Sequence, residues 1–338
     1  MAGFTEDELI GVIRRLLAED TPGVVLGLGD DAALVEMGSH LGILTSDMLV
    51  EGIHFDRETV SANDLGYKAL AVNVSDVAAM GGSPRYGMVS LGLPEEVEAS
   101  WVVELYGGLR DAAGEYAMAV VGGDTSRSER LVVSVAVTGE VARGGAVTRS
   151  GARPGDRVVV TGALGASAGG LKLLQAPPHD VAPTVASDWG RTLLNSHLRP
   201  AARVGEGQTL AQSGATAMMD VSDGLAKDLG RLCEASEVRA AVVLADVPVA
   251  LSLKELADVL PDVDPLTLAL EGGEDYELLA TMPPAAVSGA ASKLAERFGT
   301  QLTDVGEIRE GRGLVAIESD GTERPLEPRG WDHFGGLK

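Results

Sequence analysis

Most of the aspartates that could do chemistry in this chain lie where an apolar run meets Gly, Ser or Thr. They occur in the segments GDDAA (29–33), TSDML (45–49), NVSDVAAMGG (73–82), GGDTS (122–126), DVSDG (220–224) and GGEDYE (272–277). A solvated acidic surface does not need glycine beside each acid, whereas glycine lets the backbone approach a ligand closely. The pattern therefore favours a ligand site at the ends of several elements.

Carboxylates that converge from several loops repel one another and need cations to compensate them. Hard oxygen ligands without His or Cys partners suit Mg²⁺, which typically bridges a few carboxylates to phosphates. A single Asp–Gly pair is more often a turn or a helix cap than a ligand, and Asp30 and Asp76 taken alone could be caps. Six motifs together predict a nucleotide site with several magnesium ions, provided that they meet in space.

Other nucleotide motifs do not fit the sequence. The chain has no Gly-Lys pair, which a P-loop requires. GLGDDA (27–32) matches the loose dinucleotide pattern, but its two aspartates would face a bare pyrophosphate with no built-in cation. The His-Arg-Asp and Asp-Phe-Gly signatures of protein kinases are missing. The acidic motifs therefore indicate a nucleotide site of another kind.

Composition limits the class of protein. The 338 residues carry 27 basic and 50 acidic side chains, a formal charge of −23, which argues against non-specific nucleic-acid binding. A hydrophobic content of 45% excludes an intrinsically disordered chain. The single Cys233 excludes a disulfide framework and a cysteine-based zinc site. With no signal peptide and no membrane-length apolar run, we expect a cytoplasmic protein without a membrane partner.

The elements that must position the acids alternate between helices and strands. The first half is predicted to contain a helix over 6–18 with a Thr5/Glu8 capping box, strands over 24–28 and 42–45, a helix from an Asn63 cap to Met80, a strand over 87–93, a helix over 95–115, a buried strand over 117–121 and a strand over 131–141. The turn-rich segment RSGARPGD (149–156) predicts a boundary between domains 1–148 and 149–338.

The second half continues the alternation. It is predicted to contain a strand over 157–161, a mobile stretch in QAPPHDVAPT (175–184), a helix after Pro200, a strand over 215–221, a helix in SDGLAKDLGRLCEA (222–235), a strand in YELLATM (276–282), a helix near 284–298 and strands near 301–308 and 313–318. Alternation of this kind predicts an α/β or α+β fold.

In this combination and order the motifs resemble those of the thiamine-monophosphate kinase family. The likeness runs through GLGDDAA, TSDMLVEGIHF, KALAVNVSDVAAMGG, GGDTSRS, TRSGARPGD, DVSDGLAKDLG, LALEGGEDYELL and GWDHF, nearly the whole chain. It implies an N-terminal mixed-sheet domain that dimerises through its sheet and a C-terminal α/β domain that completes the active site. It also implies a homodimer that uses ATP and Mg²⁺ to phosphorylate thiamine monophosphate by direct in-line transfer, in thiamine diphosphate biosynthesis.

The resemblance also implies roles for individual residues. The implied magnesium ligands are Asp31, Thr45, Ser46, Asp47, Asp76, Asp124, Asp220 and Asp223, with Asp30 as a ligand or close neighbour. The implied ATP contacts are Gly123, Asp124, Arg149, Ser222 and, without a sharp motif, Tyr106. The implied contacts to thiamine monophosphate are His54, Glu274 and Trp331. No general base is expected, because the attacking phosphate oxygen is already anionic at pH 7.

Alternatives stay open at this stage. Related superfamily members include selenide water dikinase, but the first 60 residues here contain neither Cys nor Lys. Another member of the superfamily, a hydrogenase-maturation protein, ends in a functional Cys, whereas this chain ends in GGLK. A ligase similar to aminoimidazole-ribonucleotide synthetase and a non-catalytic sensor of magnesium and nucleotide remain the competing functions.

Overall fold

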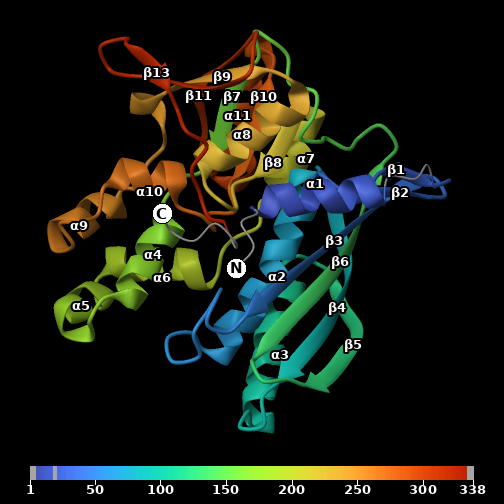
Figure 1. Ribbon diagram of the computed structural model, residues 1–338, viewed down its shortest axis with the longest axis vertical. Helices are drawn as coiled ribbons and strands as arrows, with labels where there is room; N and C mark the ends of the chain where they lie inside the picture. Colours follow the sequence, from blue (N-terminus) through green and yellow to red (C-terminus); the bar gives the residue numbers. More distant parts are fainter. Residues whose placement is uncertain (1–4, 18–20, 333–338) are drawn as a thin grey trace.

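The computed structural model describes residues 5–17 and 21–332, and two β-sheets organise it (Figure 1). The first sheet has the order β1 (Val24–Leu26), β2 (Ala33–Met37), β3 (His40–Val50), β6 (Val132–Ala142), β4 (Ser83–Leu93) and β5 (Ala119–Arg127). Only the β4–β5 pair is parallel within this sheet. The sheet is therefore mixed, as predicted.

Helices cover one face of the first sheet. The helix α2 (Ala62–Ala79) contacts β3, β4 and β6, and α3 (Ala99–Glu115) packs on α2. The two helices approach closely, because a Cβ on Gly66 would lie 2.0 Å from the carbonyl oxygen of Leu105. The helix α1 (Glu6–Leu16) precedes the first sheet in the sequence, and it has the predicted capping box between Thr5 and Glu8.

The second sheet is built from the rest of the chain. Its order is β13 (Glu323–Pro325), β12 (Gly313–Ile317), β9 (Arg239–Val243), β11 (Leu302–Arg309), β7 (Arg157–Thr161), β10 (Leu278–Met282) and β8 (Ala217–Asp220). The strands β7, β8 and β10 are buried on both faces, which explains their continuous apolar sequences. The helix α8 (Leu225–Ser236) packs on one face, and α7 (Val204–Gln212) and α11 (Pro284–Phe298) pack on the other.

Five short helices form a separate cluster beside the second sheet (Figure 1, left). They are α4 (Ala166–Gln175), α5 (Pro178–Val185), α6 (Asp188–Leu198), α9 (Ser252–Val259) and α10 (Pro265–Glu271). Their shared core includes Leu173, Val181, Leu193 and Leu253. A single turn of 3-10 helix, η1 (Leu244–Asp246), follows β9.

The helix α2 joins the two halves of the molecule. Besides the first sheet it contacts β8 and α7 of the second half, and most of its residues are buried. Burial on all sides explains why its sequence is apolar without a clear amphipathic stripe. Polar side chains on α2 are therefore held in fixed positions between the two sheets.

The fold class is confirmed, and two local predictions are wrong. Ser61 caps α2 through the N–H of Asp64, in place of Asn63. The strand β5 is exposed and not buried, because it forms the edge of its sheet. The stretch predicted to be mobile contains a helix that was not predicted, α5, which packs through the buried Val181 and starts with a proline at its first position; its mobility stays a prediction.

Some predictions fall outside the described residues or stay untested. Ala18 at the end of the first predicted helix, and His333 and Phe334 of the GWDHF motif, lie outside the part of the chain that the structure describes. The domain boundary at 148/149 stays a prediction; the first sheet ends at Ala142 and the second begins at Arg157. Among the described helices, none combines the length and apolar character needed to cross a bilayer.

Candidate active site

Three carboxylates from distant parts of the sequence meet between the two sheets. Asp31 follows β1, Asp76 lies near the end of α2, and Asp220 ends β8. Each offers a carboxylate oxygen within 4.8 Å of the other two. The predicted convergence of acidic motifs is therefore present for these three residues, which we call the acid cluster.

Neighbouring polar groups hold the acid cluster in place. The hydroxyl of Thr45 on β3 donates to Asp76 Oδ2 at 2.5 Å, and the hydroxyl of Ser75 donates to Asp220 Oδ2 at 2.5 Å. The backbone N–H of Asp47 donates to Asn73 Oδ1 on α2 at 3.0 Å. The strand β3 and helix α2 thus position the site jointly.

The acids are electrostatically strained without a cation. Burial, reinforced by neighbouring carboxylates, raises the pKa values of Asp76 and Asp220 well above the ordinary value. Burial and the charge of Asp31 raise the pKa of Asp30 to about 6. Within the described residues, the buried Asp31 Oδ2 accepts no hydrogen bond. An all-oxygen donor set with an unpaired buried oxygen fits a hard divalent cation.

Arg149 provides the positive charge closest to the cluster. Its Nε and Nη2 donate to Asp31 Oδ1 at 3.1 and 2.6 Å, and its backbone N–H donates to Asp30 Oδ2 at 3.1 Å. Burial acts to lower the pKa of Arg149, but the charge and hydrogen bond of Asp31 outweigh it, so the pKa is raised. A permanently charged guanidinium at this place suits phosphate binding.

The helix α8, which follows the DVSDG loop, holds the loop in place. The carboxylate of Asp228 on α8 accepts the N–H groups of Ser222, Asp223 and Gly224 at 3.0 to 3.1 Å. Asp223 in turn pairs with Lys227 at 2.9 Å and with Arg231 at 2.7 Å. The loop is therefore fixed, and in this structure Asp223 faces cationic side chains.

Glu274 belongs to a second group of charged side chains, besides the acid cluster. Its Oε1 lies 2.8 Å from Lys68 Nζ, and its Oε2 lies 3.3 Å from His197 Nδ1. Burial acts to raise the pKa of Glu274, but Lys68, His197 and more weakly His54 outweigh it, so the pKa is lowered. Glu274 thus carries a negative charge where a cationic group could meet it.

Comparison with known proteins places this geometry in a family. The family model "AIR synthase related protein, N-terminal domain" matches residues 29–141, and the corresponding C-terminal domain matches residues 153–318. The thiamine-monophosphate kinase of Aquifex aeolicus is 39% identical over 96% of this chain and 97% of its own length. This chain belongs to the thiamine-monophosphate kinase family. The enzyme of the same name from Bacillus subtilis is 38% identical, over 92% of this chain and 94% of its own length.

Solved structures of thiamine-monophosphate kinases are similar to this chain in fold as well as in sequence. The structure of AaThiL complexed with AMPPCP and TMP superposes with a TM-score of 0.83 at 37% identity, and covers 98% of this chain and 97% of its own. A thiamine-monophosphate kinase structure from Stenotrophomonas maltophilia has a TM-score of 0.73 at 35% identity, covering 95% of this chain and 97% of its own. The likeness therefore extends across both sheets.

Not all residues to which the family resemblance gives a role in the site lie at the acid cluster. Asp47 shares the inner face of β3 with Thr45, whereas the exposed Ser46 side chain points to the opposite face, because side chains alternate along a strand. Asp124 is exposed on the edge strand β5, beside Gly123. Tyr106 is exposed by 38% on α3. The strand β5 lies three places from β3 in the sheet, so within one chain Gly123 and Asp124 are not part of the acid cluster.

The remaining substrate residues lie on neighbouring loops. His54 Nδ1 accepts the N–H of Val50 at 3.0 Å, just beyond β3. The N–H of Trp331 donates to the carbonyl of Asp223 at 3.1 Å, and its own carbonyl accepts from Lys227. Trp331 is 39% exposed, so its ring remains partly open to solvent next to the DVSDG loop.

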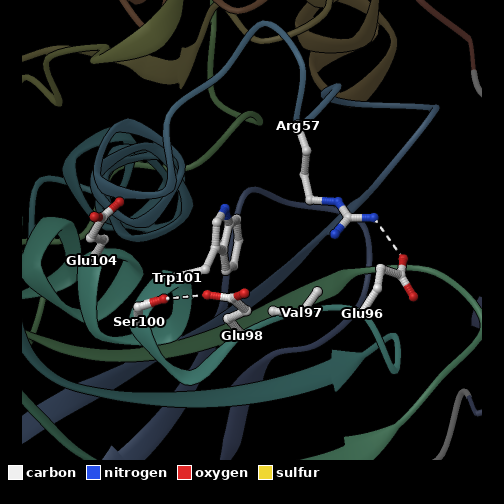
Figure 2. A pocket seen from close by; sticks show the side chains of 7 residues that line it. All are labelled: Arg57, Glu96, Val97, Glu98, Ser100, Trp101 and Glu104. Carbon is white, nitrogen blue, oxygen red and sulfur yellow. Dashed lines mark hydrogen bonds and ion pairs between the residues drawn. The ribbon is translucent and has the colours of Figure 1, made fainter.

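Two surface hollows of the described structure lie apart from the acid cluster, because none of its three carboxylates lines either of them. One, of about 340 Å³, is drawn in Figure 2; Trp101, Arg57 and three glutamates before and within the first turns of α3 line it, and Arg57 pairs with Glu96. The other, of about 310 Å³, is lined by Arg199, Arg203 and residues of α6. These two hollows therefore do not mark the acid cluster, which is recognised by its convergent charges.

Sequence reasoning missed several residues of the site. Lys68 and Asp228 lie in the segments KALAVNVSDVAAMGG and DVSDGLAKDLG, but no role was assigned to either residue. Serine-hydrolase chemistry was not expected, on the ground that the chain has no G-x-S-x-G motif; that interpretation was wrong, because GASAG (165–169) matches the pattern. Ser167 is fully buried, however, and its hydroxyl lies 3.1 Å from His197 Nδ1, the same nitrogen that faces Glu274. Ser167 therefore supports His197 and is not placed as a nucleophile.

A pH-dependent stability is expected from Asp275, which follows Glu274. It accepts the N–H groups of Gly165 and Ser167 at 2.6 and 3.2 Å, and burial raises its pKa to about 7. An acid with a raised folded pKa loses stabilisation as pH rises from about 4 to about 7. Asp275→Asn should therefore flatten the fall in Tm between pH 5 and pH 8 by several degrees.

Differential scanning calorimetry without divalent ions measures this difference. Asp262→Asn, at an exposed turn, is the matched control and should keep the wild-type pH dependence. A pH profile of Tm in Asp275→Asn that is as steep as in the wild type would contradict the assignment.

Proposed function

We propose that this chain transfers the γ-phosphoryl group of ATP to thiamine monophosphate, giving ADP and thiamine diphosphate, and so acts in thiamine diphosphate biosynthesis. The acid cluster, with Arg149 beside it, is the observation that carries the proposal. Its support comes from the thiamine-monophosphate kinase relatives and from AaThiL complexed with AMPPCP and TMP. These relatives favour the kinase over a ligase similar to aminoimidazole-ribonucleotide synthetase.

Magnesium is the cation that the donor set favours. Asp31, Asp76 and Asp220 would hold it, with Thr45 and Asp47 beside them. Bound Mg²⁺ supplies charge neutralisation between the carboxylates and the phosphates of the two substrates. Further ligation by Asp30, Ser46, Asp124 and Asp223 belongs to the proposal and rests on the family resemblance.

The chain's own residues orient the phosphates rather than react with them. Arg149 contacts Asp31 through two nitrogens, and this fork can bind phosphate oxygens in the same manner. Ser222 and Gly123 are the proposed ATP contacts on the loops, with Tyr106 on α3. The acceptor oxygen of a monophosphate is anionic at pH 7, so no side chain has to remove a proton from it.

The acceptor end of the site is proposed to contain His54, Glu274 and Trp331. Glu274 is held ionised beside Lys68 and complements the positively charged thiazolium of thiamine monophosphate. The partly open ring of Trp331 can stack on the same cation. Positioning by these groups places the acceptor phosphate against the γ-phosphoryl group in line.

Trp331→Ala is expected to weaken acceptor binding selectively. Loss of a cation–π contact worth about 0.5–2 kcal/mol should raise the KM for thiamine monophosphate roughly 2- to 30-fold. The KM for ATP and kcat should stay close to wild-type values in steady-state ADP-release kinetics. Trp101→Phe, in the separate hollow of Figure 2, serves as control; an equal rise in both KM values would contradict the role.

We also propose that the chain forms a homodimer through the outer face of the first sheet. That face exposes Leu44, Met48, Tyr86, Met88 and Val121, each at least 40% accessible. A contiguous exposed apolar face of this kind is typical of protein interfaces. A reducing cytoplasmic location is consistent with the single buried Cys233.

An ADP-release assay with Mg²⁺ omitted and then restored tests the proposed function. Turnover that requires both thiamine monophosphate and Mg²⁺ supports the kinase. ATP binding without turnover would support the non-catalytic sensor instead. Turnover with a ribonucleotide acceptor and not with thiamine monophosphate would support the ligase.

A further inference from the structure

Lys68 is a buried cation for which the phosphoryl-transfer chemistry has no direct use. It lies in the first half of α2 and is only 3% exposed. Its Nζ lies 2.8 Å from Glu274 Oε1, in the second half of the chain. Burying an ammonium group is costly unless it is paired, so this contact between the two halves needs a reason.

The turn that carries Glu274 is conformationally unusual. Glu274 has φ +67° and Tyr276 has φ +52°, both in the left-handed region that non-glycine residues seldom adopt. The N–H of Glu274 donates to the carbonyl of Ser222 at 2.7 Å, and the N–H of Tyr276 donates to that of Val221 at 2.9 Å. Strain of this kind persists only where several contacts determine the conformation together.

Side-chain contacts also hold Glu274 in this turn. Besides the ion pair with Lys68, Glu274 Oε2 lies 3.3 Å from His197 Nδ1, which is also 3.1 Å from the Ser167 hydroxyl. Burial, followed by the charge of Lys68, lowers the pKa of His197 to about 4, so His197 is neutral at pH 7. The full positive charge that faces Glu274 in this network therefore comes from Lys68.

The helix α2 links this network to the acid cluster. Lys68 and Asp76 are eight residues apart on one continuous helix, a separation of about 12 Å along its axis. The helix is buried between the two sheets, which limits its movement. One rigid element thus sets the distance from the proposed acceptor carboxylate to the proposed phosphate site.

We propose that Lys68 is a positioning residue for the acceptor, which holds the Glu274 carboxylate where it meets the cationic part of thiamine monophosphate. This inference rests on the proposed function. Lys68 acts through Glu274 and not on the phosphates, because its ammonium group is already engaged and its side chain is almost fully buried. Its loss should therefore affect acceptor binding more than the transfer step.

Steady-state kinetics of Lys68→Met and Lys68→Arg test the proposal. Since a hydrogen bond to a charged group is worth about 1.5–3 kcal/mol, Lys68→Met should raise the KM for thiamine monophosphate roughly 10- to 150-fold. The kcat and the KM for ATP should change less than about threefold, and Lys68→Arg should restore most of the loss because it keeps the charge. Tyr67→Phe is the matched control, since it removes a hydroxyl bonded to Glu115 from the same helix.

A double-mutant cycle with Glu274→Gln separates positioning from a general structural effect. If Lys68 acts through Glu274, the double variant should have a KM for thiamine monophosphate close to that of the worse single variant. Fully multiplicative effects, or an unchanged KM for thiamine monophosphate in folded Lys68→Met, would overturn the proposal. Absence of turnover in the wild-type chain would instead reject the proposed function.

A second variant covers the case in which Lys68→Met does not fold. His197→Gln removes the other contact to Glu274 and should raise the KM for thiamine monophosphate about threefold, with kcat retained. If Lys68→Met is unfolded and His197→Gln leaves this KM unchanged, the positioning role is rejected.

Discussion

Asp220→Asn is expected to lower kcat at least about 100-fold while it raises the Tm of the magnesium-free protein. Burial and the charges of Asp31 and Asp228 raise the pKa of Asp220, so keeping it ionised at pH 7 destabilises the fold. The amide removes that charge but keeps an oxygen that can accept from Ser75. Activity and stability should therefore change in opposite directions.

ADP-release kinetics and thermal unfolding in a chelator measure the two effects. Asp304→Asn is the matched control, because Asp304 lies in the same half of the chain and forms a bidentate pair with Arg157 at 2.7 and 2.9 Å. That variant should lower the Tm and leave kcat unchanged. An Asp220→Asn protein that keeps near-wild-type kcat would contradict a metal-binding role for Asp220.

Arg149→Met is expected to damage both ATP use and stability. It removes the cation that contacts Asp31 at 2.6 Å and leaves Asp30 and Asp31 as adjacent, largely buried acids. Breaking such a pair from one side costs about 3 kcal/mol or more. The kcat/KM for ATP should fall at least about 100-fold, since the phosphates lose a bidentate partner.

Arg149→Lys distinguishes fork geometry from charge alone. Lysine keeps the charge but cannot make two parallel hydrogen bonds, so it should recover stability more than activity. Urea unfolding with and without Mg²⁺ supplies the stability measurement, and added Mg²⁺ should recover part of the loss in Arg149→Met because it binds only the folded cluster. Full activity in Arg149→Lys would show that charge alone suffices.

The sequence was informative where structure is determined locally. The helix α11 and strand β7 have the predicted bounds, because their periodicity and flanking turns define them without distant contacts. The strand β5 was predicted to be buried, yet its position at the edge of the sheet exposes Val121. The helix α5 was missed because its stability comes from packing of Val181 in the helical cluster, which a Pro-rich stretch does not reveal.

The site was predictable as a set of residue types and less so as a geometry. Acidic residues at chain breaks identified Asp31, Asp76 and Asp220 before their convergence was seen. Asp124 resembles them in its motif. Within a single copy of the chain, however, it lies on the exposed edge strand β5, which is not next to the strand that carries Thr45 and Asp47. Lys68 begins the segment KALAVNVSDVAAMGG but was not assigned a role, because only its contact with Glu274 reveals one.

Anomalous X-ray diffraction from crystals grown with Mn²⁺ and a non-hydrolysable ATP analogue tests the central claim most directly. Manganese replaces magnesium at oxygen sites and gives an anomalous signal that locates each ion. The account predicts anomalous density between Asp31, Asp76 and Asp220, in contact with the nucleotide phosphates. Ordered nucleotide with no ion at these three carboxylates would contradict it.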